Sequence, residues 1–153
     1  MHSLPDPPDV AALPESIRLL QSLWKLKAAL ERTSLEMERT MGVTGPQRFL
    51  LRFVGLVPGI TQDTLAELLW VDGSHLQSDL EHLVAKKLLT ELNGSPGYCL
   101  TSQGASVNAV LSGTVEQAIS KASDEASPYE RSAFRRMLDR VVDHLGPARQ
   151  RPI

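Results

Sequence analysis

The segment 61–101 is the part of the sequence that most constrains how this chain folds. Its leucines recur at helical spacing over 62–70 and again over 74–87, and the turn-forming run Asp-Gly-Ser at 72–74 separates the two stretches. Two short apolar runs then flank a tip of Asn, Gly, Ser, Pro and Gly at 93–97, which is typical of a β-hairpin. The segment therefore predicts helix, turn, helix and hairpin in immediate succession.

This order of elements is that of a winged helix-turn-helix, an architecture that usually reads DNA. The charge of the segment points the other way, because six carboxylates oppose only Lys86 and Lys87, and 2 minus 6 gives about −4. A surface that follows a duplex is expected to attract phosphates. The architecture and the electrostatics thus favour different partners. The carboxylates are Asp63, Glu67, Asp72, Asp79, Glu81 and Glu91.

Further helical patterns lie on both sides of that segment. Apolar residues at helical spacing predict a long helix over 14–41 and a shorter one over 46–57, which Thr44 can cap. After the hairpin, similar patterns predict a helix over 102–122 and a last helix over 128–145. The predicted fold class is therefore mostly α, a winged helix-turn-helix with a small β-hairpin wing between N- and C-terminal helices.

The flanking helices carry more apolar surface than a small winged core can cover. Pairing of two copies through these helices is the economical way to bury that surface, so we expect a homodimer. The run Pro-Asp-Pro-Pro near the N-terminus is hostile to helix. The predicted organisation is a flexible N-terminal arm at 1–13, a single unit at 14–145, in which 14–41 and 102–145 are dimerisation helices and 46–101 is the winged helix-turn-helix, and a loose tail at 146–153.

Composition and charge exclude several classes of protein. No run approaches the ~18 consecutive apolar residues that a membrane span needs, so no membrane partner is expected. The single cysteine, Cys99, excludes an internal disulfide framework, and the N-terminus lacks the basic and apolar regions of a signal peptide, which favours a cytoplasmic location. The formal net charge of −2 gives no global attraction to nucleic acid, so any DNA binding must come from a local patch.

With these elements in place, the chain resembles the MarR family of dimeric winged-helix transcription regulators over about 14–145. The resemblance is carried by PQRFLLRFVG ahead of the motif, by ITQDTLAELLWVDGSHLQSDLEHLVAKKLL as helix-turn-helix, and by LTSQGASV as the step out of the wing. It implies that the terminal helices pair two subunits, that the helix over 74–87 enters a major groove of double-stranded DNA, and that the hairpin tip at 93–97 approaches a minor groove. The family wing is longer and carries an arginine that reaches DNA, whereas TELNGSPGYC has no basic residue.

The candidate DNA-binding residues fall into two groups. The first group reads bases through polar side chains on the second helix of the motif, and the second holds phosphates through cations. For the two arginines, which lie four positions apart on one helix, the alternative is an ordinary solvated charge. The base-reading candidates are Ser74, His75, Gln77 and Ser78, and the phosphate-binding candidates are Lys86, Lys87, Arg48 and Arg52.

Aromatic side chains give a candidate for ligand binding. The family binds small aromatic or lipophilic effectors between the dimer helices and the winged domain, and Trp24, Phe49 and Phe53 are the side chains here that could line such a pocket. The alternative is that they pack as ordinary apolar residues.

Other chemistry finds little support in the sequence. His75 and His82 lie seven positions apart and share a helical face, but two exposed histidines explain them better than a metal site. Cys99 has no neighbouring positive charge to activate its thiol, so we expect it to be inert. No catalytic motif occurs, and we therefore expect no enzyme, no catalytic residue, no metal and no cofactor.

Three functions remain from the sequence. The first is a homodimeric DNA-binding transcription regulator that responds to an effector. The second is a winged-helix protein that has lost DNA binding and acts as a protein-interaction module, which the acidic motif and the wing without arginine favour. The third is a small-molecule-binding module without DNA output.

Overall fold

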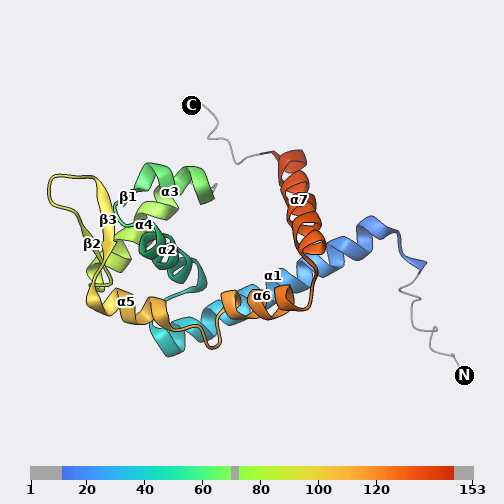
Figure 1. Cartoon of the computed structure of the whole chain (residues 1–153), viewed down its shortest axis with the longest axis horizontal. Helices are drawn as coiled ribbons and strands as arrows, with labels where there is room; N and C mark the ends of the chain where they lie inside the picture. Colours follow the sequence, from blue (N-terminus) through green and yellow to red (C-terminus); the bar gives the residue numbers. More distant parts are fainter. Residues whose placement is uncertain (1–11, 70–72, 147–153) are drawn as a thin grey trace, which may run out of the picture.

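The computed structural model describes residues 12–69 and 73–146. Seven helices and three short strands are assigned within these ranges, and Figure 1 shows their arrangement. Residues 1–11 of the predicted N-terminal arm, residues 147–153 of the predicted tail, and residues 70–72 lie outside the described residues. The elements are α1 (Glu15–Met41), α2 (Gly45–Leu56), β1 (Ile60–Thr61), α3 (Gln62–Leu69), α4 (Gly73–Ala85), β2 (Leu89–Glu91), β3 (Gly97–Leu100), α5 (Ser102–Ala109), α6 (Val115–Asp124) and α7 (Pro128–Leu145).

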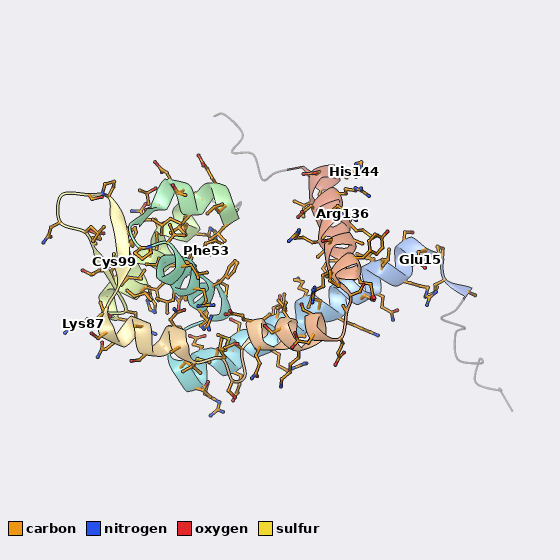
Figure 2. All side chains as sticks on the ribbon, viewed as in Figure 1. Glu15, Phe53, Lys87, Cys99, Arg136 and His144 are labelled. Atoms are coloured by element: carbon orange, nitrogen blue, oxygen red, sulfur yellow. The ribbon has the colours of Figure 1, made fainter. Side chains whose placement is uncertain are left out.

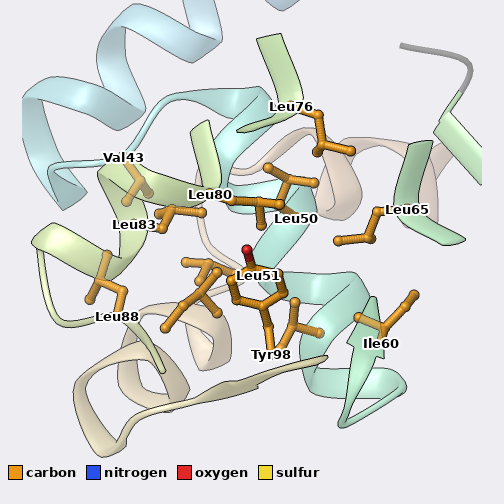
Figure 3. Packing of buried hydrophobic residues seen from close by; sticks show 12 residues of the cluster. Val43, Leu50, Leu51, Ile60, Leu65, Leu76, Leu80, Leu83, Leu88 and Tyr98 are labelled. Atoms are coloured by element: carbon orange, nitrogen blue, oxygen red, sulfur yellow. The ribbon is translucent and has the colours of Figure 1, made fainter. Parts of the chain in front are cut away.

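The elements from α2 to α5 form what we call the winged unit. Leucines from α2, α3 and α4 meet over one face of the sheet, as Figure 3 shows, and their burial removes apolar surface from water at about 1.5 to 3 kcal/mol for each large side chain. Apolar spacing along the helices predicts inward positions at Leu50, Val54, Leu65, Leu76, Leu80 and Leu83, which are buried, and also at Phe49 and Leu68, which are 53% and 57% exposed. The core consists of Val43, Leu50, Leu51, Val54, Ile60, Leu65, Leu76, Leu80, Leu83, Leu88, Leu89 and Tyr98.

The wing is a three-stranded antiparallel sheet in the order β1-β3-β2. The predicted hairpin is confirmed in β2 and β3, where Leu89 pairs with Leu100. Strand β1 was not expected, and it pairs Ile60 with Tyr98. This third strand depends on Gly97, because a Cβ at that position would collide with the backbone of Gly59.

Local capping explains where α2 begins. The Thr44 hydroxyl accepts a hydrogen bond from the backbone N–H of Gln47 at 3.2 Å, and the Gln47 side chain accepts one from the Thr44 N–H at 3.1 Å. These two bonds form a capping box, which satisfies two donors at the start of the helix. The expected cap at Thr44 is thereby confirmed, and α7 begins with the same device at Ser127.

The helix predicted over 102–122 is wrong in one respect, because the structure divides it into α5 and α6. Helix α5 ends at Ala109, where Val110 adopts an extended conformation, and Gly113 with φ +76° keeps the chain out of the helical conformation before α6. The Thr114 hydroxyl then donates to the Leu111 carbonyl at 2.6 Å and accepts from the Gln117 N–H at 3.2 Å, so it caps α6. The sequence Gly-Thr followed by Gln three positions later carries this signal, which apolar periodicity alone overlooks.

The remaining helices leave much apolar surface uncovered. Along α1 only Met37 is buried, and neither α6 nor α7 has a buried residue. In Figure 1, α7 stands well apart from the winged unit. We call α1, α6 and α7 the helical arm. Within the described ranges, no helix is both long enough and apolar enough to cross a membrane.

Candidate nucleic-acid interface

Helix α4 presents a polar face to solvent. Its other side is fixed to the core by Leu76, Leu80 and Leu83, which are all buried. Because the helix repeats every 3.6 residues, the positions between these leucines point outward. The structure therefore brings all four base-reading candidates to one exposed surface: Ser74, His75, Gln77 and Ser78.

Several side chains of α4 are already engaged in the single chain. Gln77 donates a hydrogen bond from Nε2 to Glu81 Oε1 at 2.9 Å. Asp79 is half-buried and accepts from Gln47 Nε2 at 3.4 Å, so this carboxylate is directed toward α2. The pair at Gln77 is exposed and can exchange for another partner, whereas Asp79 takes part in packing α4 on α2.

The structure pairs Arg48 and Arg52 with a carboxylate of α6, and it buries Arg48 while leaving Arg52 partly exposed. Arg48 is 3% exposed, and its guanidinium contacts Glu116 at 3.2 Å. Arg52 holds the same carboxylate with two nitrogens, at 2.8 and 2.9 Å. Glu116 engages both arginines because their side of α2 faces α6, and their contact with DNA stays a prediction. Sequence reasoning missed Glu116, which lies 64 or more positions away from both arginines.

The electrostatics of this cluster favour the ionised carboxylate. The hydrogen bond from Arg52, joined by that from Arg48, lowers the pKa of Glu116 against the opposing effect of burial. Arg48 also donates from Nη2 to the backbone carbonyls of Asn108 at 3.2 Å and Val110 at 3.0 Å. The cluster therefore joins α2 to the end of α5 and to the start of α6.

The two lysines after α4 have different surroundings. Lys86 donates to the Gly42 carbonyl, on the loop between α1 and α2. Lys87 has φ +61°, a left-handed conformation that ends α4, and its side chain is exposed at the edge of the winged unit (Figure 2). Both lysines are exposed, and they are the phosphate-binding candidates that remain on the open surface of the described chain.

The wing adds negative rather than positive potential. A cleft of about 470 Å³ lies between the wing and the start of α3, and it contains the carboxylates of Asp63 and Glu91. Burial raises the pKa of Tyr98 in this cleft, and the nearby Glu91 and Glu81 act in the same direction. An anion is therefore disfavoured here. The lining consists of Thr61, Gln62, Asp63, Glu91, Ser95, Pro96 and Tyr98.

The candidate ligand residues lie on two different helices, Trp24 on α1 and the two phenylalanines on α2. Phe49 and Phe53 pack edge to face on α2 with ring centroids 4.9 Å apart. Trp24 is 59% exposed on α1, and Lys27 lies over its ring at 5.3 Å from the centroid. A groove of about 770 Å³ between α6 and α7 is lined by other residues, among them Ile119 and Phe134.

Cys99 and the two histidines do not form a site within the described residues. No group of three or more His, Cys, Asp or Glu side chains is arranged to hold a metal ion in 12–69 and 73–146. Cys99 is half-buried on β3 as an unpaired thiol.

Comparisons with known proteins place this architecture. No family model and no curated protein matches the chain. Solved structures do: the transcriptional regulator SlyA superposes with a TM-score of 0.68 at 20% identity over 83% of this chain and 93% of that one. MepR of Staphylococcus aureus in complex with DNA gives 0.66 at 16% identity over 82% and 96%.

A third similar structure contains a small aromatic acid. It is the MarR family protein Rv2887 of Mycobacterium tuberculosis with p-aminosalicylic acid, which gives a TM-score of 0.54 at 20% identity over 84% of this chain and 98% of that one. At identities this low, the structural likeness establishes the fold alone. The chain therefore has the winged-helix fold of the MarR-family transcription regulators.

Proposed function

We propose that the chain is a homodimeric DNA-binding transcription regulator that presents α4 to the major groove. The observation that carries this proposal is the polar outer face of α4 within a winged helix-turn-helix. Gln77 suits adenine, since a Gln amide can bond to N6 and N7 together, and Ser74, His75 and Ser78 offer further donors and acceptors. The likeness to a MepR–DNA complex supports the same docking.

Dimerisation through the helical arm completes the proposal. The arm exposes large apolar side chains that a monomer would leave in water, including Ile17, Trp24, Ile119 and Phe134. Exposed apolar surface of this extent marks an interaction site. A second copy covers both the long α1 and the groove between α6 and α7, and two copies of α4 then face neighbouring half-sites.

Phosphate contacts are few in this arrangement. Lys87 is the exposed cation next to α4, with Lys86 beside it, and backbone N–H groups at helix N-termini supply further contacts. Gln77 must leave Glu81 before it reads a base. We therefore expect a site that depends on base contacts and has a shallow salt dependence.

A small aromatic or lipophilic effector is the second element of the proposal. It is supported by the Rv2887 complexes with p-aminosalicylic acid and salicylic acid. Trp24 of the arm and the Phe49–Phe53 pair of α2 are the side chains proposed to contact it once two subunits are paired. A cytoplasmic location goes with this role.

The test is fluorescence anisotropy with genomic fragments from the source organism at about 50 and 200 mM salt. The proposal predicts a fragment preference that Gln77→Ala abolishes or relaxes by tenfold or more, since a bidentate base contact contributes about 1 to 3 kcal/mol of discrimination. The matched control is Gln103→Ala on the exposed face of α5. Equal binding of all fragments by the parent protein would remove the proposal.

A protein-interaction module is the second candidate function. It is favoured by the acidity of the winged unit, whose exposed carboxylates at Asp63, Glu67, Glu81 and Glu91 outnumber its exposed lysines, while both arginines are held by Glu116. No binding of any fragment at the lower salt concentration would favour this candidate.

A further inference from the structure

We propose that Glu116 is a positioning residue, which fixes the direction of α6 on the winged unit and thereby sets the separation of the two α4 helices in the dimer. The functional consequence rests on the proposed function, whereas the orientation itself belongs to the single chain. Glu116 lies on α6 and touches neither DNA nor an effector in the proposed function.

The first support is the geometry of the ion cluster. One carboxylate receives three hydrogen bonds from Arg52, between 2.8 and 3.2 Å, and another from Arg48 at 3.2 Å. Two planar guanidinium groups on one carboxylate restrict its direction as well as its distance, because each bond has its own preferred angle. The cluster therefore fixes the start of α6 on α2 in one orientation.

The second support is what else joins α6 to the winged unit, since α1 is joined to it separately through the hydrogen bond from the Gly45 N–H to Ser34 Oγ at 2.8 Å. In the described chain, Glu116 is the α6 side chain that forms hydrogen bonds to the winged unit, and it accepts all of them from Arg48 and Arg52. The connection 110–114 between α5 and α6 contains Gly113 at positive φ. Without the cluster, this short connection would leave the direction of α6 poorly determined. Arg48 also holds the connection itself, through the Val110 carbonyl.

The third support is the continuation of the link toward α4. Gln47, the neighbour of Arg48 on α2, is buried and donates to Asp79 on α4 at 3.4 Å. Adjacent residues of a helix point about 100° apart, so Gln47 and Arg48 serve different neighbours. Helix α2 thus joins the arm on one side and the candidate recognition helix on the other through polar side chains.

The energetics favour orientation over stability as the role of the cluster. Burying a charged group is costly, and an apolar contact of similar size often stabilises a protein as well. Arg48 Nε and Asn108 Oδ1 are buried without a hydrogen-bond partner in the described structure, which adds to the cost. What the cluster supplies in addition is directional restraint, which an apolar contact lacks.

The experiment is a distance measurement between two spin labels within one subunit. Labels are attached after His82→Cys on α4 and Arg136→Cys on α7, in a Cys99→Ser background; both positions are exposed. Labelled chains are diluted with unlabelled chains, so that the measured pairs lie within one subunit. The parent is compared with Glu116→Gln, and the matched control is Glu125→Gln at the exposed end of α6.

The expected result is a narrow distance distribution in the parent and in Glu125→Gln, and one at least twice as wide, or shifted, in Glu116→Gln. Far-UV circular dichroism should be unchanged. If Glu116→Gln does not fold, Arg52→Gln replaces it, because this variant keeps the Arg48–Glu116 pair, and partial broadening is expected. An unchanged distribution in the folded variant would overturn the inference.

A second readout connects the orientation to DNA. Glu116→Gln should lose about tenfold in affinity for a duplex with two half-sites and less than twofold for a single half-site. Equal losses on both duplexes would contradict a positioning role. Because the distances are measured without DNA, an absence of DNA binding would count against the proposed function, while the distance distributions would still test the orientation of α6.

Discussion

The winged unit and the helical arm differ in how they bury their apolar residues. Nearly all buried apolar residues belong to the winged unit or the loop that leads into it, whereas α6 and α7 bury none. Both regions follow the same helical periodicity in sequence. Helical periodicity in the sequence therefore indicates which face of a helix is apolar, but it does not indicate whether the same chain covers that face. The winged unit covers its own apolar residues, and a second copy of the chain is proposed to cover those of the helical arm.

The largest loss of stability is expected from a cavity in the core of the winged unit. Leu80→Ala removes a fully buried side chain of α4 and should lower the free energy of unfolding by about 3 kcal/mol, because it loses apolar burial and leaves a cavity. Urea unfolding followed by circular dichroism measures the loss. The matched control, Leu68→Ala on the exposed side of α3, should cost less than about 0.5 kcal/mol. Equal costs would erase the distinction between core and surface.

A substitution in the helical arm should weaken dimerisation. Phe134→Ala on α7 removes an exposed ring that lines the groove between α6 and α7, and should weaken the dimer about 10- to 100-fold, as loss of an interface aromatic does. Sedimentation velocity over a range of concentrations measures this. Leu68→Ala again serves as the control, since α3 lies outside the arm. A dimer constant unaffected by Phe134→Ala would separate the arm from dimerisation.

The junction of the two regions should show a pH signature. Because the pKa of Glu116 is lowered in the folded chain, the unfolded chain binds more protons as the pH falls. The contribution of Glu116 to stability is therefore complete above the ordinary Glu pKa of about 4.3 and is lost as the pH falls below it. Glu116→Gln should lower stability by about 1 kcal/mol or less at pH 7, because solvent screens a carboxylate whose side chain is 38% exposed.

The gap between the parent and Glu116→Gln should then close in acid. Urea unfolding of both proteins at several pH values tests this, with Glu125→Gln as a control that should track the parent throughout. A constant gap from pH 7 down to the lowest pH at which the protein stays folded would mean that the carboxylate charge contributes nothing.

The smallest expected effect is electrostatic and concerns DNA. Lys87→Gln should reduce the slope of log affinity against log salt by about 1 for each subunit, since it removes one phosphate contact. Lys121→Gln on the exposed side of α6 is the matched control and should leave the slope unchanged. Anisotropy titrations at several salt concentrations measure both. A parent slope near zero would mean that Lys87 touches no phosphate.

The sequence predicts the elements that local signals define. The Thr44 cap and the helix over 128–145 agree with the structure because caps and apolar spacing act within a few residues. Strand β1 escapes such reasoning, since its two residues form a strand only by pairing with β3. The break at Gly113 and Thr114 was present in the sequence as a capping signal, but the apolar pattern runs across it.

The candidate site was predicted less completely than the fold. The outward face of α4 follows from helix geometry, so Gln77 and Ser78 lie where the sequence places them. Arg48 and Arg52 were expected at a DNA surface because a basic pair four positions apart gives no indication of its partner. That partner, Glu116, is far away in sequence, and only the folded chain brings it to α2.

Hydroxyl-radical footprinting of the protein on the genomic fragment that it binds best tests directly whether it binds DNA as a dimer. A dimer that presents two α4 helices predicts two protected half-sites on one face of the duplex, with centres one helical turn, about 10 base pairs, or a multiple of it apart. A single protected half-site would contradict the dimeric arrangement. No protection at about 50 mM salt would contradict DNA binding itself and would favour a protein partner for the acidic winged unit.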